Sequence, residues 1–343
     1  MLCGMMDGGE LTCWLLSEPK AGMAVQCLAL AEAMGLQGER KHVQPRGLWK
    51  RSPIWLWPLW GGGLKAVGPG SDAIGPPWPD VVISCGRYAA GVAMAIRQQS
   101  RHSGKRTFTI QIQDPLVSPR HFDLMIVPEH DRLRGENVIT MQGSLHRITD
   151  ARLQAEAAKF ASSFEHLPRP LATVLIGGPN RVYQLGVAEA TAIAQQLVAM
   201  AQQQRVSLAM TVSRRTSPEA AAAMRKIIET ADIPAVIWEG EGENPYFGYL
   251  GSADYILVTA DSINMTCEAS ATGKPVYTLD LPGGRGKFAR FHQQMQHEGR
   301  TRLFEGKLEP YEPNPLRENE KIAAEVWRRL PPTISPPTGS TTT

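Results

Sequence analysis

Metal-ligand motifs, long apolar runs and paired cysteines are all missing from this sequence. Its five cysteines among 343 residues include no Cys-x-x-Cys pair, which argues against a disulfide framework and against a zinc site. No stretch reaches about 18 consecutive apolar residues, so we expect no membrane-spanning helix. The amino terminus also lacks the basic and apolar regions of a signal peptide. These absences predict a protein of the reducing cytosol without a disulfide framework or a zinc site; we also expect no other metal and no resident cofactor.

What is present is typical of a globular protein with two domains. The composition is 43% hydrophobic and 20% charged, and 343 residues are more than one domain with a single hydrophobic core usually contains. Apolar runs of strand length alternate with helical segments, which indicates α/β domains built on parallel sheets. The proline-containing segment 166–170 is the best linker. We therefore expect domains at residues 1–165 and 166–330, and a disordered Pro/Ser/Thr-biased tail at 331–343.

The most informative stretch lies at residues 253–279. An apolar strand is followed there by Asp261 and Ser262, whose side chains suit the first turn of a helix. A Gly-Lys-Pro sequence ends this helix and precedes a second strand. A ligand over the carboxyl ends of such strands meets capped helix N-termini, which bind anions, and Glu268 could reach back to hydroxyl groups such as those of a ribose. The alternative is an ordinary β-α-β unit with good caps.

Two further turns in the second half suit phosphate binding. A Gly-Gly turn at 177–178, after an expected strand, lets backbone N–H groups approach a phosphate closely. Arg214 and Arg215, between Ser213 and Thr216, follow the next strand and are a candidate diphosphate clamp. A solvated basic turn is the alternative.

Polar residues also follow the expected strands of the first half. Arg87, after Gly86, suits a carboxylate or a phosphate. Asp114 follows strand 107–113 and is a candidate general base, provided that burial raises its pKa. Taken singly, each is explained as well by a strand-end cap or a surface ion pair. The run 129–131, Glu-His-Asp, lacks metal-ligand spacing.

Residues 40–65 combine six basic residues and no acidic one with interleaved tryptophan and leucine. Tryptophan prefers the membrane–water boundary, and lysine and arginine attract anionic headgroups. This composition suits a segment lying on a membrane face. The alternatives are packing of the tryptophans as a satellite core or acceptor pocket, and stacking on nucleic acid, for which no recognisable module is present.

The order Asp261-Ser262, Met265, Glu268 and Gly273-Lys274-Pro275 resembles the nucleotide-sugar-binding segment of GT-B glycosyltransferases. More closely, the chain resembles the ELM-type mitochondrial-fission family and its bacterial relatives, which are regarded as GT-B glycosyltransferases. Further matches to that family include Gly22 with Gln26 and extend to about Gly306. The resemblance implies two Rossmann-like domains whose parallel sheets face each other across a cleft, with a terminal helix that crosses back to the first domain.

The resemblance also implies a function and its site residues. We expect a metal-independent glycosyltransferase that moves a sugar from a nucleotide sugar to a lipid-linked, cell-envelope acceptor of the lipopolysaccharide-core type. It would act in the cytoplasm or on the cytoplasmic face of the inner membrane, without nucleic acid. Asp114 and Arg87 are the expected catalytic residues. The expected donor-binding residues are Gly177, Gly178, Asn180, Ser213, Arg214, Arg215, Thr216, Asn244, Tyr246, Asp261, Ser262, Met265, Glu268, Lys274 and Arg290. The expected acceptor- or membrane-side residues are Gly22, Gln26, Arg46, Lys50, Arg51, Trp55, Trp57 and Trp60.

Two other functions stay open. A nucleotide-sugar epimerase on the same fold would not need the basic, tryptophan-rich segment. A non-catalytic adaptor, as the name of the plant fission relatives suggests, would bind no nucleotide sugar. A dinucleotide-dependent dehydrogenase is disfavoured, because no Gly-x-Gly-x-x-Gly follows an expected strand.

Overall fold

The computed structural model describes residues 11–57, 63–238 and 240–336. The chain divides into two compact units, one made of Met1–Arg147 with Glu318–Thr343 and the other of Ile148–Arg317. The sequence predicts the boundary after residue 165, whereas the units divide at Arg147. The physical reason is helix α3 (Asp150–Lys159), which packs against α6 (Tyr246–Ser252) of the second unit. A side chain at Gly251 would meet the carbonyl oxygen of Leu153 at 2.4 Å, so glycine permits this close packing.

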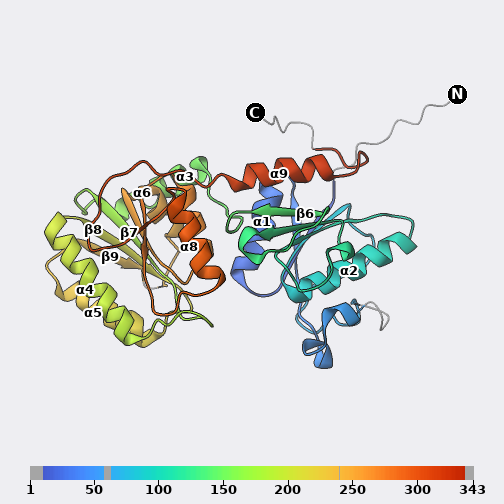
Figure 1. The fold of residues 1–343 in the computed structure, drawn as a ribbon, viewed down its shortest axis with the longest axis horizontal. Helices are drawn as coiled ribbons and strands as arrows, with labels where there is room; N and C mark the ends of the chain where they lie inside the picture. The colour runs from blue at the N-terminus through green and yellow to red at the C-terminus, as the bar shows by residue number, and fades with distance from the viewer. Residues whose placement is uncertain (1–10, 58–62, 239, 337–343) are drawn as a thin grey trace. The chain divides into compact units, whose positions relative to one another are not determined.

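The first unit is built on a six-stranded parallel sheet in the order β2-β1-β3-β4-β5-β6. Alternate residues of its strands enter two separate cores. Leu15 packs on one face with helices α1 and α9, whereas Leu16 packs on the other face with α2. Figure 1 shows α9, in red, beside α1. The strands are β1 (Cys13–Ser17), β2 (Gly38–His42), β3 (Val81–Cys85), β4 (Phe108–Ile112), β5 (Leu124–Pro128) and β6 (Val138–Met141). The helices are α1 (Ala21–Ala33), α2 (Arg87–His102) and α9 (Glu318–Arg329), with 3-10 helices η1 (Gly47–Lys50), η2 (Ile54–Leu56), η3 (Pro119–His121) and η4 (Glu129–Asp131).

The second unit repeats this plan with the strand order β12-β11-β10-β7-β8-β9, again parallel. Leu257 packs with α4 and α5 on one face, and Val258 packs with α3, α6 and α7 on the other. The strands are β7 (Leu171–Ile176), β8 (Ser207–Val212), β9 (Ala235–Trp238), β10 (Tyr255–Thr259), β11 (Val276–Leu279) and β12 (Arg302–Leu303). The remaining helices are α4 (Val187–Gln204), α5 (Pro218–Thr230), α7 (Ile263–Ala271), α8 (Lys287–His297) and the 3-10 helix η5 (Ala161–Ser163).

The predicted α/β class with two parallel sheets is therefore confirmed. Two strands, β2 and β12, cannot be predicted from their sequences. Strand β2 has the charged sequence Gly-Glu-Arg-Lys-His because it lies at a sheet edge, where much of it stays exposed. Strand β12 has only two residues, too few to show a period.

The last segment departs partly from expectation. The sequence predicts disorder from residue 331, yet residues 331–336 are described, and Ile334 packs against the core shared by α1 and α9. Residues 337–343 lie outside the described part of the chain. Within the described ranges, no helix is long and apolar enough to cross a bilayer.

Candidate functional site

Three polar turns meet at the carboxyl edge of the second sheet. Strands β10, β7 and β8 are neighbours and parallel, so the residues that follow them lie at one edge. Gly177 follows β7, Ser213 follows β8, and Asp261 stands two residues beyond β10. The structure thus brings together three predicted turns that are far apart in sequence.

The Asp261 side chain ties these turns together. It is fully buried, and one carboxylate oxygen accepts hydrogen bonds from the backbone N–H of Gly178 at 3.0 Å and from Nη2 of Arg215 at 2.7 Å. The other oxygen accepts one from the hydroxyl of Thr259 at 2.7 Å. A buried carboxylate needs such partners, because an unpaired charge away from water is costly.

Glycine is required at both positions of the Gly-Gly turn. A Cβ at residue 177 would lie 2.1 Å from an Asp261 oxygen, and a Cβ at residue 178 would lie 2.4 Å from the carbonyl carbon of Arg215. The hydroxyl of Thr216 donates to the Gly177 carbonyl at 2.5 Å. The turn is therefore tightly packed against its neighbours. The Gly178 N–H, which the sequence predicts to bind a phosphate, donates instead to the Asp261 carboxylate.

The two adjacent arginines differ in their surroundings, which corrects the predicted clamp. Arg215 donates to the Gly178 carbonyl oxygen as well as to Asp261, so its guanidinium holds the turn. Arg214 is exposed and has no hydrogen bond or ion pair to any described residue. Ser213 accepts from the Arg215 N–H at 3.1 Å. Both side chains are exposed, but only Arg215 is held by hydrogen bonds within the turn.

Asn180 shapes the loop that follows the Gly-Gly turn. Its amide donates to the Asp261 carbonyl oxygen at 3.2 Å, and its side-chain oxygen accepts from the N–H groups of Val182 and Tyr183. The site also depends on His292, whose Nε2 lies 2.8 Å from the Ala260 carbonyl oxygen. Burial lowers the pKa of His292, and this contact fixes α8 against the end of β10.

Helix α7 begins at the site as the sequence predicts. The Ser262 hydroxyl accepts from the Met265 N–H at 3.3 Å, a side-chain cap of the first turn. Met265 itself packs against the core between α6 and the sheet. The capped N-terminus of α7 lies next to Asp261, at the edge where the three turns meet.

Glu268 lies one and a half turns into α7 and pairs with Tyr246 at the start of α6. The Tyr246 hydroxyl donates to the Glu268 carboxyl group at 2.5 Å. Burial raises the pKa of Glu268 to about 7, and the Tyr246 hydrogen bond opposes that rise. Burial and the neighbouring carboxyl group raise the pKa of Tyr246 well above its ordinary value. Asn244 accepts from the Tyr246 N–H at 3.0 Å and so sets the entry into α6.

Lys274 lies elsewhere, which corrects its predicted place. It precedes β11 and therefore stands at the amino edge of the parallel sheet, opposite to the edge that holds Asp261. Its ammonium group donates to the carbonyl oxygens of Leu250 at 2.8 Å and of Gly251 at 2.5 Å, at the end of α6. Burial lowers its pKa to about 8. Arg290 is exposed on α8, the helix held by His292.

In the first unit, the carboxyl edge holds a carboxylate that sequence reading missed. Glu18, buried after β1, accepts from the Tyr88 N–H at 2.9 Å at the start of α2. A Cβ at Gly86 would lie 2.7 Å from the same Glu18 oxygen, and Gly86 has a φ of +103°. The predicted catalytic Arg87 donates to the Ser52 carbonyl oxygen at 3.1 Å. A carboxylate therefore occupies the helix start that Gly86-Arg87 suggested for an anion.

Asp114 follows β4 and closes a tight local turn. One of its carboxylate oxygens accepts from the Leu116 N–H at 2.7 Å. Gly22 and Gln26, predicted on the acceptor side, both lie in the first half of α1. Gln26 is 1% exposed, and its side-chain oxygen has no hydrogen-bond partner among the described residues.

The predicted tryptophans of the membrane side separate into different environments. Trp57 is 1% exposed and belongs to the core beneath α2, which corrects its predicted place on the membrane side. Trp55 is 52% exposed, and Arg46, Lys50 and Arg51 are also exposed. Trp60 lies outside the described residues.

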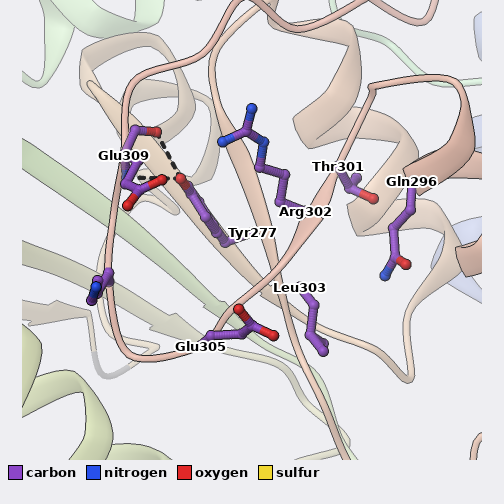
Figure 2. Close-up of a pocket in the computed structure, with 8 residues that line it drawn as sticks. Tyr277, Gln296, Thr301, Arg302, Leu303, Glu305 and Glu309 are labelled. Carbon is purple, nitrogen blue, oxygen red and sulfur yellow. Dashed lines mark hydrogen bonds between the residues drawn. The ribbon is translucent and has the colours of Figure 1, made fainter.

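A cavity of about 430 Å³ lies in the second unit beside β11 and β12. In Figure 2 the Tyr277 hydroxyl makes hydrogen bonds with the backbone of Glu309. The side chains of Arg302 and Leu303 point away from each other. None of the expected donor-binding residues lines this cavity, so the cavity is a different site from the Asp261 turns. Among the described residues, no group of three or more His, Cys, Asp or Glu side chains could hold a metal ion.

Comparison with known proteins identifies relatives in sequence and in fold. Residues 21–330 match the family described as Mitochondrial fission ELM1. The Mitochondrial fission protein ELM1 of Arabidopsis thaliana is 31% identical over 279 residues, which are 74% of this chain and 64% of the plant protein. An uncharacterized protein of Rickettsia prowazekii is 26% identical over 71% of this chain and 78% of its own length.

Solved structures that share the fold include two epimerases. The UDP-GlcNAc 2-epimerase of Neisseria meningitidis, bound to UDP-GlcNAc, aligns with a TM-score of 0.52 at 13% identity, over 93% of this chain and all of the epimerase. The UDP-GlcNAc 2-epimerase of Methanocaldococcus jannaschii aligns with a TM-score of 0.54 at 12% identity, over 92% and 99%. At this identity the likeness establishes a shared GT-B-type fold.

Proposed function

Since this chain belongs to the Mitochondrial fission ELM1 family, we propose that its second unit binds a nucleotide sugar at the carboxyl edge of the sheet. The observation that carries the proposal is the meeting of three turns around Asp261, next to the capped start of α7, with the exposed Arg214 in one of these turns. Helix starts and an arginine are the groups that bind phosphates at such an edge. The fold shared with two UDP-GlcNAc 2-epimerases, one of them bound to UDP-GlcNAc, agrees with such a ligand.

Glu268 and Tyr246 would contact the ribose. A carboxylate accepts hydrogen bonds from two adjacent hydroxyl groups, whereas a protonated carboxyl group accepts fewer. Because the pKa of Glu268 is raised to about 7, nucleotide affinity should increase as the pH rises through about 7. Arg290, on α8, is the expected partner of the distal phosphate or the sugar.

We further propose that the chemistry is transfer of the sugar to a lipid-linked, anionic acceptor of the lipopolysaccharide-core type at the cytoplasmic face of the inner membrane. Helix dipoles and Arg214 would stabilise the leaving diphosphate without a metal. Asp114 would accept the acceptor proton through the carboxylate oxygen that does not bond to Leu116. Arg87, which already bonds to Ser52, would orient an acidic group of the acceptor.

A non-catalytic adaptor is the second candidate, and a specific observation favours it. Two of the basic residues expected to bind the donor, Arg215 and Lys274, instead support the protein's own backbone and carboxylates. The plant relative is named for mitochondrial fission, and this chain spans 64% of that protein's length. An adaptor would bind partner proteins and would leave the Asp261 turns without a nucleotide.

Thermal-shift measurements with a panel of nucleotides and nucleotide sugars distinguish nucleotide-sugar binding from the adaptor function. A ligand at about 100 times its dissociation constant stabilises the protein by about 2.7 kcal/mol. We expect one nucleoside diphosphate series to stabilise the wild type, Glu268→Gln to lose most of the shift, and Glu229→Gln, an exposed carboxylate on α5, to retain it. If no member of the panel shifts the wild type, the adaptor takes first place.

The bound nucleotide sugar then identifies the chemistry. Release of the nucleoside diphosphate only in the presence of a lipid-linked saccharide supports transfer. Conversion of the sugar without any acceptor supports an epimerase and contradicts the proposed transfer.

A further inference from the structure

A short segment of the first unit, residues 47–57, is held on α2 by the buried Trp57 and by hydrogen bonds of Ser52 and Tyr88. Ser52 accepts a hydrogen bond from Nε1 of Trp57 at 2.9 Å and donates to the Trp49 carbonyl oxygen at 3.1 Å. Trp57 stacks on Tyr88, with ring centres 6.3 Å apart and planes 5° apart. The Tyr88 hydroxyl donates to the Lys50 carbonyl oxygen at 3.0 Å. These contacts fix residues 47–57 on α2, and Figure 1 shows this blue segment extending beyond α2.

The sequence of α2 accommodates this anchor. A Cβ at Gly91 would lie 2.4 Å from the Trp57 ring, so glycine there makes room for the indole. Trp57 is 1% exposed in consequence. A buried, stacked tryptophan holds its neighbours in the chain firmly, because the ring supplies a large apolar contact with few rotatable bonds.

The same segment holds two large apolar side chains out in solvent. Leu48 is 88% exposed and Trp55 is 52% exposed. Only three other large apolar side chains among the described residues are comparably exposed. Exposed apolar residues scattered singly need no explanation, but two on one anchored segment form a surface that water solvates poorly.

Basic side chains accompany these two residues. Arg46, Lys50, Arg51 and Lys65 are exposed, and none of the four makes an ion pair with a carboxylate in the part of the chain that the structure describes. No acidic residue occurs in the sequence between Glu39 and Asp72. Residue 65 is brought to the segment by its flanking backbone, since the Arg46 N–H donates to the Ala66 carbonyl oxygen at 2.9 Å.

We propose that Leu48, Trp55 and these four basic side chains form a docking surface for an anionic lipid membrane. Leu48 and Trp55 enter the headgroup region, where an indole ring is stable, and the basic side chains contact lipid phosphates. A bilayer fits better than single-stranded nucleic acid, which needs successive exposed aromatic rings for its bases. Trp55 is the one tryptophan of residues 47–57 that is mainly exposed.

This inference does not depend on the nucleotide site. All the residues that carry it lie in the first unit, while the Asp261 turns lie in the second. Docking is therefore expected without any nucleotide, and Glu268→Gln should bind membranes as the wild type does. Failure of one proposal leaves the other intact.

Vesicle co-sedimentation of the full chain tests the docking surface. The probes are vesicles of phosphatidylcholine alone and of equal parts phosphatidylcholine and phosphatidylglycerol, at low and high salt. We expect the wild type to prefer the anionic vesicles, with about fivefold weaker binding for each basic side chain removed, and with the preference lost at high salt. Lys50→Glu with Arg51→Glu, and Leu48→Ser with Trp55→Ser, should each reduce binding by at least tenfold.

Leu116→Ser is the matched control, because Leu116 is 84% exposed but lies outside the docking surface. It should bind anionic vesicles as well as the wild type does. All variants should keep the thermal unfolding midpoint of the wild type, since the changed side chains are exposed. Equal binding of the wild type to both kinds of vesicle, or wild-type binding by both double variants, would overturn the proposal.

Discussion

Burial of the Glu268 carboxyl group makes stability depend on pH. Its pKa is raised to about 7 in the folded protein, above its ordinary value of 4.5. The folded state therefore holds the proton more tightly than the unfolded chain does. The stabilisation is complete below pH 4.5 and is lost as the pH rises through about 7, by about 3 kcal/mol at most.

We expect Glu268→Gln to remove this pH dependence. Glutamine keeps an oxygen that accepts the Tyr246 hydrogen bond but has no proton to lose. Urea unfolding between pH 4.5 and pH 8 should show a stability loss in the wild type that the variant lacks. Parallel curves for the two proteins would mean that Glu268 titrates as an ordinary surface acid.

Gly177→Ala tests whether the Asp261 turns are as tightly packed as they look. The new methyl group would lie 2.1 Å from an Asp261 oxygen, so the carboxylate must move away from Gly178 and Arg215. We expect a loss of about 1–3 kcal/mol in the free energy of unfolding, together with a loss of nucleotide binding.

Gly75→Ala is the control for that change, because a Cβ at residue 75 meets nothing within 4 Å. It should leave stability within about 0.5 kcal/mol of the wild type. A Gly177→Ala protein as stable as this control would contradict the tight packing. Sequence reading found Gly177 and Asp261 by motif, but it could not show that one fills the space beside the other.

At the scale of elements, strands are easier to read from sequence than the direction in which their side chains point. Strand β7 has the nearly continuous apolar sequence Leu-Ala-Thr-Val-Leu-Ile and is buried along its whole length, so its sequence alone identifies it as a strand buried on both faces. Lys274 was misplaced for a different reason. A Gly-Lys-Pro motif fixes the end of a helix, but the partner of the lysine depends on where α6 ends in space.

We expect Lys274 and Arg214 to separate stability from ligand binding. Lys274→Met leaves the Leu250 and Gly251 carbonyl oxygens without their donor, so the free energy of unfolding should fall by about 1–3 kcal/mol. Its nucleotide affinity should be unchanged, because Lys274 lies at the opposite sheet edge.

Arg214→Ala is expected to do the reverse. Arg214 is exposed, so stability should hardly change, while affinity for a nucleoside diphosphate should fall by about tenfold or more with the loss of a charged hydrogen bond. Urea unfolding and calorimetric titration measure the two quantities. Loss of affinity in Lys274→Met without loss of stability would restore the lysine to the donor site.

For the whole molecule, the family and the two parallel sheets could be predicted from sequence, and both are confirmed. Local sequence patterns determine strands and helix caps, so these features can be predicted from the sequence alone. The role of Glu18 could not be predicted, because its contact with Tyr88 spans 70 positions and carries no local signal. The burial of Trp57 and the exposure of Trp55 could not be predicted either, because Trp57 is buried in the space that Gly91 leaves in α2.

Helix α9 is part of the first unit's core although it follows the second unit in sequence. Ile322, Val326 and Leu330 are buried against α1 and the sheet, and the Gln142 N–H donates to Glu318 at 3.0 Å. Burying these three apolar side chains contributes about 5–9 kcal/mol, which is comparable to the whole stability of a domain.

Truncation after Arg317 should therefore unfold the first unit and leave the second folded. We expect the shortened chain to lose the protease resistance of residues 11–147 while residues 148–317 stay resistant and keep the nucleotide-induced thermal shift. A control that ends at residue 336 should behave like the full chain. Equal protease resistance of residues 11–147 in the truncated and full chains would show that α9 is dispensable.

The late position of α9 also has a consequence for synthesis on the ribosome. The strands of the first unit emerge early, but α9, which covers one face of their sheet together with α1, is translated only after residues 148–317. At ordinary elongation rates, that interval lasts roughly 10–30 s. While the second unit folds, the nascent chain thus carries an apolar sheet face that α1 covers in part and that α9 does not yet cover. Chaperone capture during translation should concentrate on the first unit, and slower elongation through residues 148–317 should lower the yield of folded protein.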